Sequence, residues 1–352
     1  MRRPKPGKAF DLNYESDPFG ERGPKLSRKR LRLLGARIEF DSNSSELLAL
    51  VEKAYAGLPT HRLRARPLEL RIGLRLTGGA ATARGLAAPP PIAMFHGPGR
   101  RRQDPVCLGG ATGASNFVVL SARQRAALVV ASPEILKFPY HARYELIEFA
   151  VFTLAARAQR LVPLHAACVG REGRGLLLIG GSGAGKSTVT LHCMLDGFDF
   201  LSEDSVFVAP GSMLATGVAN FLHIRADSLR WLGRSTEAAA IRGSPVIRRR
   251  SGVEKFEVDL RRDPFRLAPA PMRIVAVVFL SPQGAGERPL LELLPRSEAR
   301  RNLEAGQGYG ASQPQWRTFI RKASNLDAFE LRRGRHPRDA VAVLRSLLSR
   351  RK

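Results

Sequence analysis

The stretch GLLLIGGSGAGKSTVTLHCMLDG, residues 175–197, combines three local patterns. Gly175 to Ile179 is a short apolar run that predicts a buried strand. The next residues, Gly180 to Ser187, match the pattern G-x-x-x-x-G-K-[ST]. From there to Asp196 apolar residues recur at helical spacing, and Gly197 suits a helix C-terminal cap. A strand, a glycine turn and a helix in direct succession predict an α/β fold.

The residue types in this loop suit a phosphate group. Glycines let the backbone curl so that N–H groups point inward, and the helix that follows directs its positive end to the same place. Lys186 adds a charge for the β- and γ-phosphates, and the Ser187 hydroxyl can ligate Mg²⁺. We therefore expect these residues to bind a nucleotide: Gly180, Gly181, Ser182, Gly183, Ala184, Gly185, Lys186, Ser187 and Thr188. The alternative is a glycine-rich turn with an incidental lysine, since the bare pattern arises by accident in about one such chain in a hundred.

Two acidic residues follow the next predicted strand. Phe198 to Leu201 is apolar, and Glu203 and Asp204 come directly after it. Because ligands of open α/β sheets bind at the carboxyl ends of strands, these carboxylates are candidates for the same site. One would hold Mg²⁺ and the other would accept the proton of an attacking hydroxyl, and the residues leave open which does which. A solvated turn is the alternative.

Further polar residues are weaker candidates. His165 lies among apolar residues just before a predicted strand, where a core histidine is the alternative. Lys255 and Arg225 are cations that a loop could bring to a γ-phosphate, although a solvated loop with surface cations is the favoured interpretation.

At this point the residues resemble a known family. The segments LHAACV (164–169), GGSGAGKST (180–188) and FLSEDSVFV (200–208) are similar to the HPr serine kinase/phosphorylase catalytic domain. They are more similar still to the HPr-kinase-related proteins found beside peptide-modification genes. The resemblance implies a P-loop-containing mixed sheet flanked by helices. It also implies transfer of the γ-phosphoryl group of ATP, with Mg²⁺, to a serine-type hydroxyl of a protein or peptide.

Residue roles carry over from the family by position. His165 takes the place of the histidine that supports the base, and Glu203 and Asp204 take the places of the paired aspartates that act as base and metal ligand. The resemblance thus implies Ser187, Glu203 and Asp204 as metal ligands. It implies these catalytic residues: His165, Lys186, Glu203 and Asp204.

Two positions depart from the family pattern. The first aspartate is Glu203 here, longer by one methylene, so the division between base and metal ligand stays open. The family's loop ends in Ser-Glu, whereas this chain has Ser187 followed by Thr188, so a carboxylate near the metal is missing. The reverse, phosphorylase activity therefore stays open as well.

Other functions also remain open. One is a catalytically silent nucleotide-binding protein with a regulatory or scaffold role. Another is a small-molecule kinase or plain NTPase, which would accept a metabolite or water in place of a protein. The identity of the acceptor and the oligomeric state, a homo-oligomer included, are not encoded in any motif that we can name.

The rest of the chain predicts three regions. Residues 1–30 form a flexible basic tail, residues 31–160 an N-terminal α+β domain of unknown role, and residues 161–350 the P-loop domain. Within the N-terminal region, the alternation from Leu68 to Leu76 predicts a strand with one solvated face, and residues 84–116 read as a long loop. Asn43 and Glu46 have capping-box spacing before a helix.

Composition limits the partners. The net charge is +26, with 47 arginines among 57 basic residues, but they are scattered and no aromatic-rich nucleic-acid motif accompanies them. We therefore expect no nucleic-acid partner. The N-terminus lacks an apolar stretch, and the longest apolar runs are strand-sized, so we expect a cytoplasmic protein without a membrane span. Cys168 and Cys193 fall in apolar patterns and are expected to fill core space.

Overall fold

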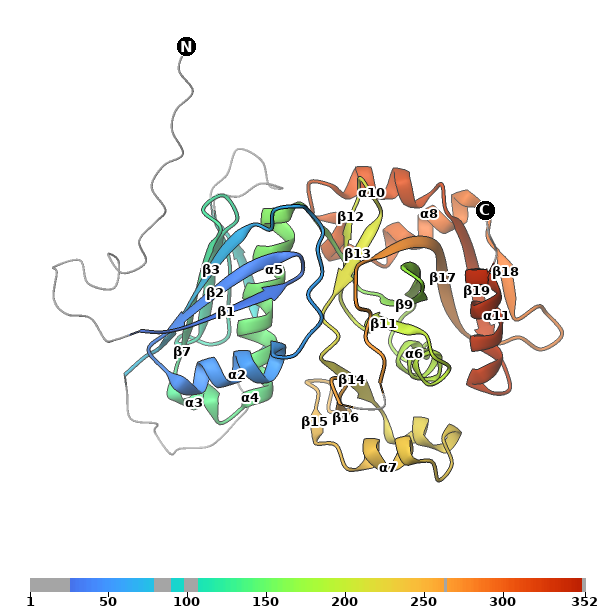
Figure 1. The fold of residues 1–352 in the computed structure, drawn as a ribbon, viewed down its shortest axis with the longest axis horizontal. Coiled ribbons are helices and arrows are strands. Elements are labelled where there is room, and N and C mark those ends of the chain that lie inside the picture. The colour runs from blue at the N-terminus through green and yellow to red at the C-terminus, as the bar shows by residue number, and fades with distance from the viewer. Residues whose placement is uncertain (1–25, 79–89, 98–106, 263–264, 350–352) are drawn as a thin grey trace, which may run out of the picture. The chain divides into compact units, whose positions relative to one another are not determined.

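The chain forms two compact units (Figure 1). The computed structural model describes residues 26–78, 90–97, 107–262 and 265–349. The first unit comprises Met1–Leu31, Arg37–Ala54 and Glu69–Ala158, and the second comprises Arg32–Ala36, Tyr55–Leu68 and Gln159–Lys352. Two short segments of the expected N-terminal domain thus belong to the second unit. In the described ranges, no helix is long and apolar enough to cross a membrane.

The first unit is built on a seven-stranded mixed sheet. In spatial order its strands are β1 (Ser27–Leu33), β2 (Ala36–Ser42), β3 (Glu69–Leu76), β7 (Ala126–Ala131), β6 (Phe117–Ser121), β5 (Leu108–Ala111) and β4 (Ala93–His96). Strands β2, β3 and β7 run parallel, and β7, β6, β5 and β4 pair antiparallel. The helical segments are α2 (Ser45–Tyr55), α3 (Pro133–Leu136), α4 (Pro139–His141), the π-helix η1 (Ala142–Ile147) and α5 (Glu148–Gln159).

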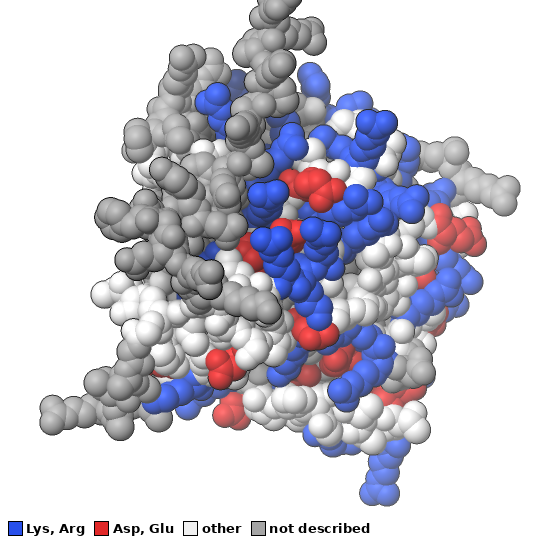
Figure 2. All heavy atoms as spheres, turned by 60° about the vertical axis from the view of Figure 1, so that its left-hand side comes forward, with Lys and Arg blue, Asp and Glu red and all other residues white. Residues whose placement is uncertain are grey.

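Alternation along β3 has the expected consequence only over the first half of the strand. Leu70 and Ile72 are buried, whereas Glu69 and Arg71 are exposed, so this part has the predicted solvated face. Further along the same face, Gly73 is buried and the Arg75 side chain, paired with Asp41, is only 15% exposed. In the view of Figure 2, lysine and arginine side chains outnumber acidic ones among the described residues, in keeping with the net charge of +26.

Three expectations for this region need correction. The sequence predicts a basic tail over residues 1–30. Residues 1–25 of it lie outside the described residues, and the remainder is not a tail because strand β1 begins at Ser27. The loop expected over residues 84–116, where described, contains strands β4 and β5. The α2 cap is Ser44, whose Oγ accepts from the Leu47 amide at 3.3 Å. Asn43 cannot cap this helix because its amide group bonds both backbone groups of Leu76.

The second unit contains a nine-stranded mixed sheet. Its main path is β11 (Asp199–Ser202), β9 (Ala167–Arg171), β10 (Arg174–Ile179), β17 (Met272–Gly284), β13 (Leu214–Gly217), β12 (Val206–Ala209) and β8 (Val162–Leu164). Strand β19 (Asp327–Arg333) pairs with β17 and with β18 (Leu291–Leu293). The prediction of an α/β fold with a mixed sheet is confirmed at this level.

Strand direction brings distant segments to one edge of this sheet. Strands β10, β17 and β19 are parallel neighbours. Strand β11 pairs antiparallel with β9, which pairs antiparallel with β10, so β11 also runs parallel to β10. The carboxyl ends of all four strands therefore meet at the same edge, where ligands of α/β sheets bind.

Helices cover both faces of the sheet. Successive residues of β10 alternate between the two cores, with Leu176 and Leu178 in one and Leu177 and Ile179 in the other. The first core is closed by α6 (Lys186–Leu195) and α11 (Pro337–Ser349), and the second by α8 (Arg296–Ala305) and α10 (Trp316–Ala323). Cys193 and Cys168 are free thiols buried in these cores, as expected for small core residues.

A small three-stranded sheet lies beyond the end of β13. It consists of β14 (Phe221–Ile224), β16 (Glu254–Asp259) and β15 (Val246–Arg248). Between β14 and β15 the chain forms the 3-10 helix η2 (Ala226–Trp231) and helix α7 (Thr236–Arg242). Much later in the chain, Gln307 directly precedes the short helix α9 (Gly308–Ala311). Leu222, Ile224 and Val258 of this sheet join the core that contains α6.

Helix α6 offers a matched test of the core. Leu191 is fully buried, and Leu195, one turn later on the same helix, is 38% exposed. We expect Leu191→Ala to lower the free energy of unfolding by about 2–5 kcal/mol, since it removes buried apolar surface and leaves a cavity. Leu195→Ala should cost less than about 1 kcal/mol. Urea unfolding of the two variants measures the difference, and equal losses would contradict this packing of α6.

Candidate functional site

The glycine-rich loop, residues 180–185, connects β10 to the N-terminus of α6. Gly183 and Gly185 have φ values of 79° and 99°, a region that side chains with a Cβ rarely adopt. These two residues turn the chain sharply enough for α6 to begin at Lys186. The loop lines a cavity of about 440 Å³, within the range of small-molecule sites.

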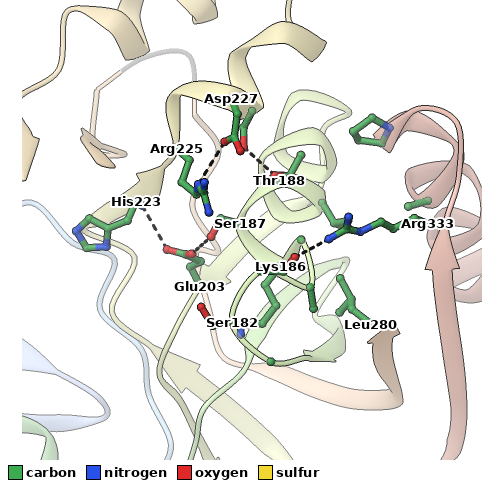
Figure 3. A pocket seen from close by; sticks show the side chains of 18 of the residues that line it. Ser182, Lys186, Ser187, Thr188, Glu203, His223, Arg225, Asp227, Leu280 and Arg333 are labelled. Carbon is green, nitrogen blue, oxygen red and sulfur yellow. Dashed lines mark hydrogen bonds and ion pairs between the residues drawn. The ribbon is translucent and has the colours of Figure 1, made fainter. Parts of the chain in front are cut away.

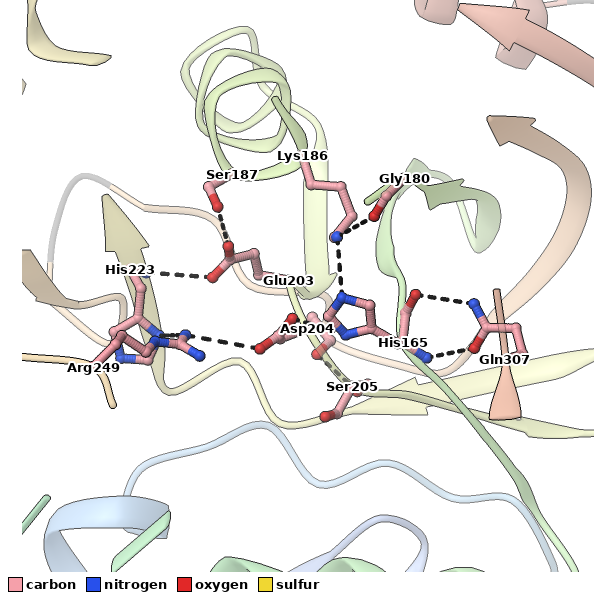
Figure 4. A network of polar contacts seen from close by, with 11 residues as sticks. His165, Gly180, Lys186, Ser187, Glu203, Asp204, Ser205, His223, Arg249 and Gln307 are labelled. Carbon is pink, nitrogen blue, oxygen red and sulfur yellow. Dashed lines mark hydrogen bonds and ion pairs between the residues drawn. The ribbon is translucent and has the colours of Figure 1, made fainter. Parts of the chain in front are cut away.

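Lys186 lies at the centre of this cavity and is only 8% exposed. Its ammonium donates to the Gly180 carbonyl at 2.7 Å and to Nε2 of His165 at 3.3 Å (Figure 4). Burial lowers the pKa of Lys186, and the Asp204 and Glu203 carboxylates act in the opposite direction. The cation is thus held beside the loop by acceptors and by two nearby negative charges.

His165 joins Lys186 to Asp204. Since Nε2 of His165 accepts from the lysine, Nδ1 carries the proton and faces Oδ1 of Asp204 at 3.1 Å. The other Asp204 oxygen lies 3.8 Å from the Arg249 guanidinium. Burial acts to raise the pKa of Asp204, but the His165 hydrogen bond and the Arg249 charge outweigh it and hold that pKa well below its ordinary value. Asp204 is therefore a carboxylate at neutral pH.

Glu203 has different partners from Asp204. The Ser187 hydroxyl donates to one oxygen of Glu203, and the backbone N–H of His223 donates to the other at 3.3 Å (Figure 4). Glu203 is 6% exposed, whereas the Asp204 side chain is 43% exposed. The two neighbouring acids thus separate into a buried one beside α6 and an open one beside His165.

The pair of Ser187 and Glu203 fits a divalent cation. A hydroxyl and a carboxylate oxygen in contact beside the glycine-rich loop are the hard oxygen ligands that Mg²⁺ prefers. Among the described residues, no group of three or more His, Cys, Asp or Glu side chains is arranged to hold a metal ion. A cation at Ser187 and Glu203 would therefore need ligands from a bound molecule or from water.

Gln307 holds the backbone of His165 on both sides. Its side-chain oxygen accepts from the His165 N–H at 2.7 Å, and its amide donates to the His165 carbonyl at 3.1 Å (Figure 4). Gln307 is 2% exposed and stands 142 residues later in the chain. Sequence reasoning missed this residue, because a buried glutamine in a glycine-rich segment has no local signature.

The opposite wall of the cavity comes from η2 and from the end of β19. Thr188 in the first turn of α6 contacts the Ser228 hydroxyl of η2 at 3.0 Å. Arg333, at the end of β19, donates to the Gly183 carbonyl at 2.6 Å (Figure 3). The loop is therefore tied to two segments that sequence reasoning did not connect with it.

All of the sequence-predicted site residues line the same cavity, apart from Gly180, which accepts from Lys186. Lys255 and Arg225 line it too, although Arg225 is exposed and paired with Asp227 at 3.4 Å. Burial lowers the pKa of Lys255, while Glu203 acts to raise it. The additional lining residues Arg249, Trp231 and Arg333 could not be selected from the many arginines and aromatic residues of the sequence.

Another histidine, His192, lies in the last turn of α6, away from the glycine-rich loop. His192 is 4% exposed, and its ring meets that of His336 edge-on at 5.5 Å between centroids. Burial, followed by the charges of His336 and Arg338, lowers the pKa of His192 from 6.5 to about 4. The neutral form is therefore the one that the folded chain accommodates.

This shift predicts a pH dependence of stability. Between pH 6.5 and about 4 the unfolded chain binds a proton at His192 that the folded chain does not. The free energy of unfolding should therefore fall as the pH is lowered through this window, by about 3 kcal/mol in all, and His192 should contribute no further loss below it. His192→Phe should flatten this part of the curve in urea unfolding at stepped pH. An unchanged slope would contradict the neutral buried histidine.

Comparisons with known proteins give likenesses among solved structures alone. No family model matches the chain, and no curated protein matches it. Among solved structures, the chain is similar to the Hpr(Ser) kinase/phosphatase from Coxiella burnetii, with 12% sequence identity and a TM-score of 0.24. That match covers 52% of this chain and 94% of the other. A likeness at this level carries no argument about activity, so the site has to be interpreted from its own geometry.

Proposed function

We propose that the chain is an ATP-dependent kinase that transfers the γ-phosphoryl group to a serine-type hydroxyl of a protein or peptide. The observation that carries this proposal is the convergence of Asp204, paired with His165, on the cavity that holds Lys186 and the glycine-rich loop. A phosphate cradle and a carboxylate base in one cavity are what phosphoryl transfer to a hydroxyl requires.

The P-loop side of the cavity would bind the donor. Backbone N–H groups of residues 181–187 and the positive end of α6 would bind the β- and γ-phosphates of ATP. Lys186 would exchange its contact with His165 for a phosphate oxygen. Ser187 and Glu203 would hold Mg²⁺, which supplies charge neutralisation of the phosphates when bound. Thr188, in contact with Ser228, replaces the family's glutamate here, so Glu203 carries that part alone.

Asp204 is the better candidate for the base. Asp204 is paired with His165 and Arg249, and it does not contact Ser187, the proposed metal ligand. Glu203 does contact Ser187, so that carboxylate would be occupied by the metal. The acceptor hydroxyl would give its proton to Asp204 while its oxygen forms a bond to the γ-phosphorus. The bond from that phosphorus to the bridging oxygen breaks, and ADP leaves with the electron pair. His165 would orient Asp204 through Nδ1–H and stabilise its charge.

The openness of the base favours a large acceptor. The side chains of His165 and Asp204 are 56% and 43% exposed. A hydroxyl that protrudes from a peptide or protein can reach such a base, whereas an enzyme for a small metabolite would enclose it.

Labelled ATP tests the proposal directly. Full-length protein with γ-labelled ATP, Mg²⁺ and a library of serine-, threonine- and tyrosine-containing peptides should label serine peptides first. Lys186→Ala should abolish both nucleotide binding and labelling. Nucleotide binding that depends on Lys186, without label in any peptide or protein, would overturn the kinase and leave the catalytically silent binding protein. Label released only as inorganic phosphate would leave the NTPase.

Two of the acidic side chains that line the cavity, Asp204 and Asp227, give a matched pair of variants. Asp204→Asn should retain ATP binding and lower the rate of labelling by roughly 10²–10⁴-fold, because the base is lost. Asp227→Asn, which changes another carboxylate of the same cavity, should change the rate by no more than a few-fold. Equal effects of the two substitutions would contradict the assignment of Asp204.

Gln307 is a positioning residue in this scheme. Gln307→Leu removes both bonds to the His165 backbone, so the His165–Asp204 pair loses its fixed geometry. We expect kcat to fall at least about tenfold while the affinity for ATP changes little, since the loop itself is untouched. Urea unfolding checks that the variant is folded. A matching loss of ATP affinity would indicate general damage to the fold in place of positioning.

A further inference from the structure

The cavity has two chemically different ends. Charged groups surround Lys186 at one end. Beyond the first turn of α6 the lining includes the apolar and aromatic side chains of Val189, Trp231, Pro337 and Ala340, beside polar ones such as Arg230 and His336. Val189 stands three residues after Lys186, roughly 4.5 Å further along the helix axis. Phosphates bound at the loop would thus leave the rest of a nucleotide facing this second end.

Trp231 is held at this end from several sides. Its segment η2 is tied to α6 through the contact between Ser228 and Thr188. Its ring meets the His336 ring at 5.1 Å between centroids, nearly perpendicular at 80°. His336 in turn meets His192 of α6. The indole is therefore fixed over the helix face that carries Val189 and His192, and it is still partly exposed towards the cavity.

The ring already accepts a flat partner. The Arg230 guanidinium lies 4.7 Å from the centre of the Trp231 ring. A guanidinium is planar and stacks on aromatic faces, as a nucleobase does. Arg230 is exposed and lines the same cavity, so a base could displace its guanidinium from the ring. An aromatic face and nearby cations can bind a nucleobase by stacking, without hydrogen bonds to the edge of the base.

We propose that this end of the cavity is a nucleobase site in which Trp231 stacks on the base and favours purines. The inference rests on the proposed nucleotide binding at the loop and adds the part of the ligand that the loop does not contact. Stacking energy rises with ring area, so ATP and GTP should bind more tightly than CTP and UTP.

Inorganic tripolyphosphate separates the two ends of the site, because it carries the phosphates of ATP without the base. Isothermal titration of the full-length protein with ATP and with tripolyphosphate gives both affinities. Trp231→Leu keeps an apolar side chain but removes the aromatic face, and should weaken ATP binding about tenfold, equivalent to about 1.4 kcal/mol, while tripolyphosphate binding stays within twofold. Trp231→Phe should retain most of the ATP affinity. Lys186→Ala should weaken both ligands.

Fluorescence supplies a second measurement on a folded variant. Trp231 and Trp316 are the only tryptophans, and Trp316, the first residue of α10, packs against the core on the other face of the large sheet. In Trp316→Phe, the remaining emission comes from Trp231, and it should be quenched by ATP but not by tripolyphosphate.

The outcomes distinguish the two proposals. Failure of the wild-type protein to bind either ligand would overturn nucleotide binding itself, and the base site with it. Binding of both ligands with equal sensitivity to Trp231→Leu, or with no sensitivity, would overturn the base site alone. Equal affinity for purine and pyrimidine triphosphates would also overturn it, because stacking on Trp231 would then select nothing.

Discussion

A lysine ammonium that is only 8% exposed needs compensating acceptors, and the arrangement around Lys186 follows from that need. The Gly180 carbonyl and Nε2 of His165 take its protons, and the carboxylates of Glu203 and Asp204 balance its charge. These partners come from different strands. Gly180 and the two acids follow the carboxyl ends of the parallel strands β10 and β11, and His165 precedes the amino end of the antiparallel strand β9, so all of them lie at one edge of the sheet.

The two adjacent acids, Glu203 and Asp204, have different partners and different exposure although they are neighbours in the sequence. Side chains of neighbouring residues point in different directions, so Glu203 turns to Ser187 and Asp204 turns to His165. One is buried and faces the helix that would carry the metal, and the other is open and faces the histidine. The same division separates donor binding from proton acceptance in the proposed kinase, so a glutamate at the first position does not disturb the base.

Contacts from far along the chain complete the site. Gln307 fixes the His165 backbone, Arg333 holds the loop at Gly183, and His336 supports Trp231. All three follow β17, after the segment that resembles a known family. The C-terminal third of the chain therefore shapes both the proposed base and the proposed nucleobase site, although it contributes none of the residues of the phosphate loop itself.

The sequence by itself determined the β10–loop–α6 unit, because local hydrophobic periodicity and glycine spacing are encoded within a few residues. Glu203 and Asp204 became candidates through their position after the next strand, and His165 through the resemblance to a known family. It misplaced the α2 cap, since Asn43 is claimed by the distant backbone of Leu76. It also could not show that Glu203 contacts Ser187 and Asp204 contacts His165, or select Gln307 and Trp231. Only the tertiary structure decided these, because each depends on partners that are remote in sequence and brought together by the sheet.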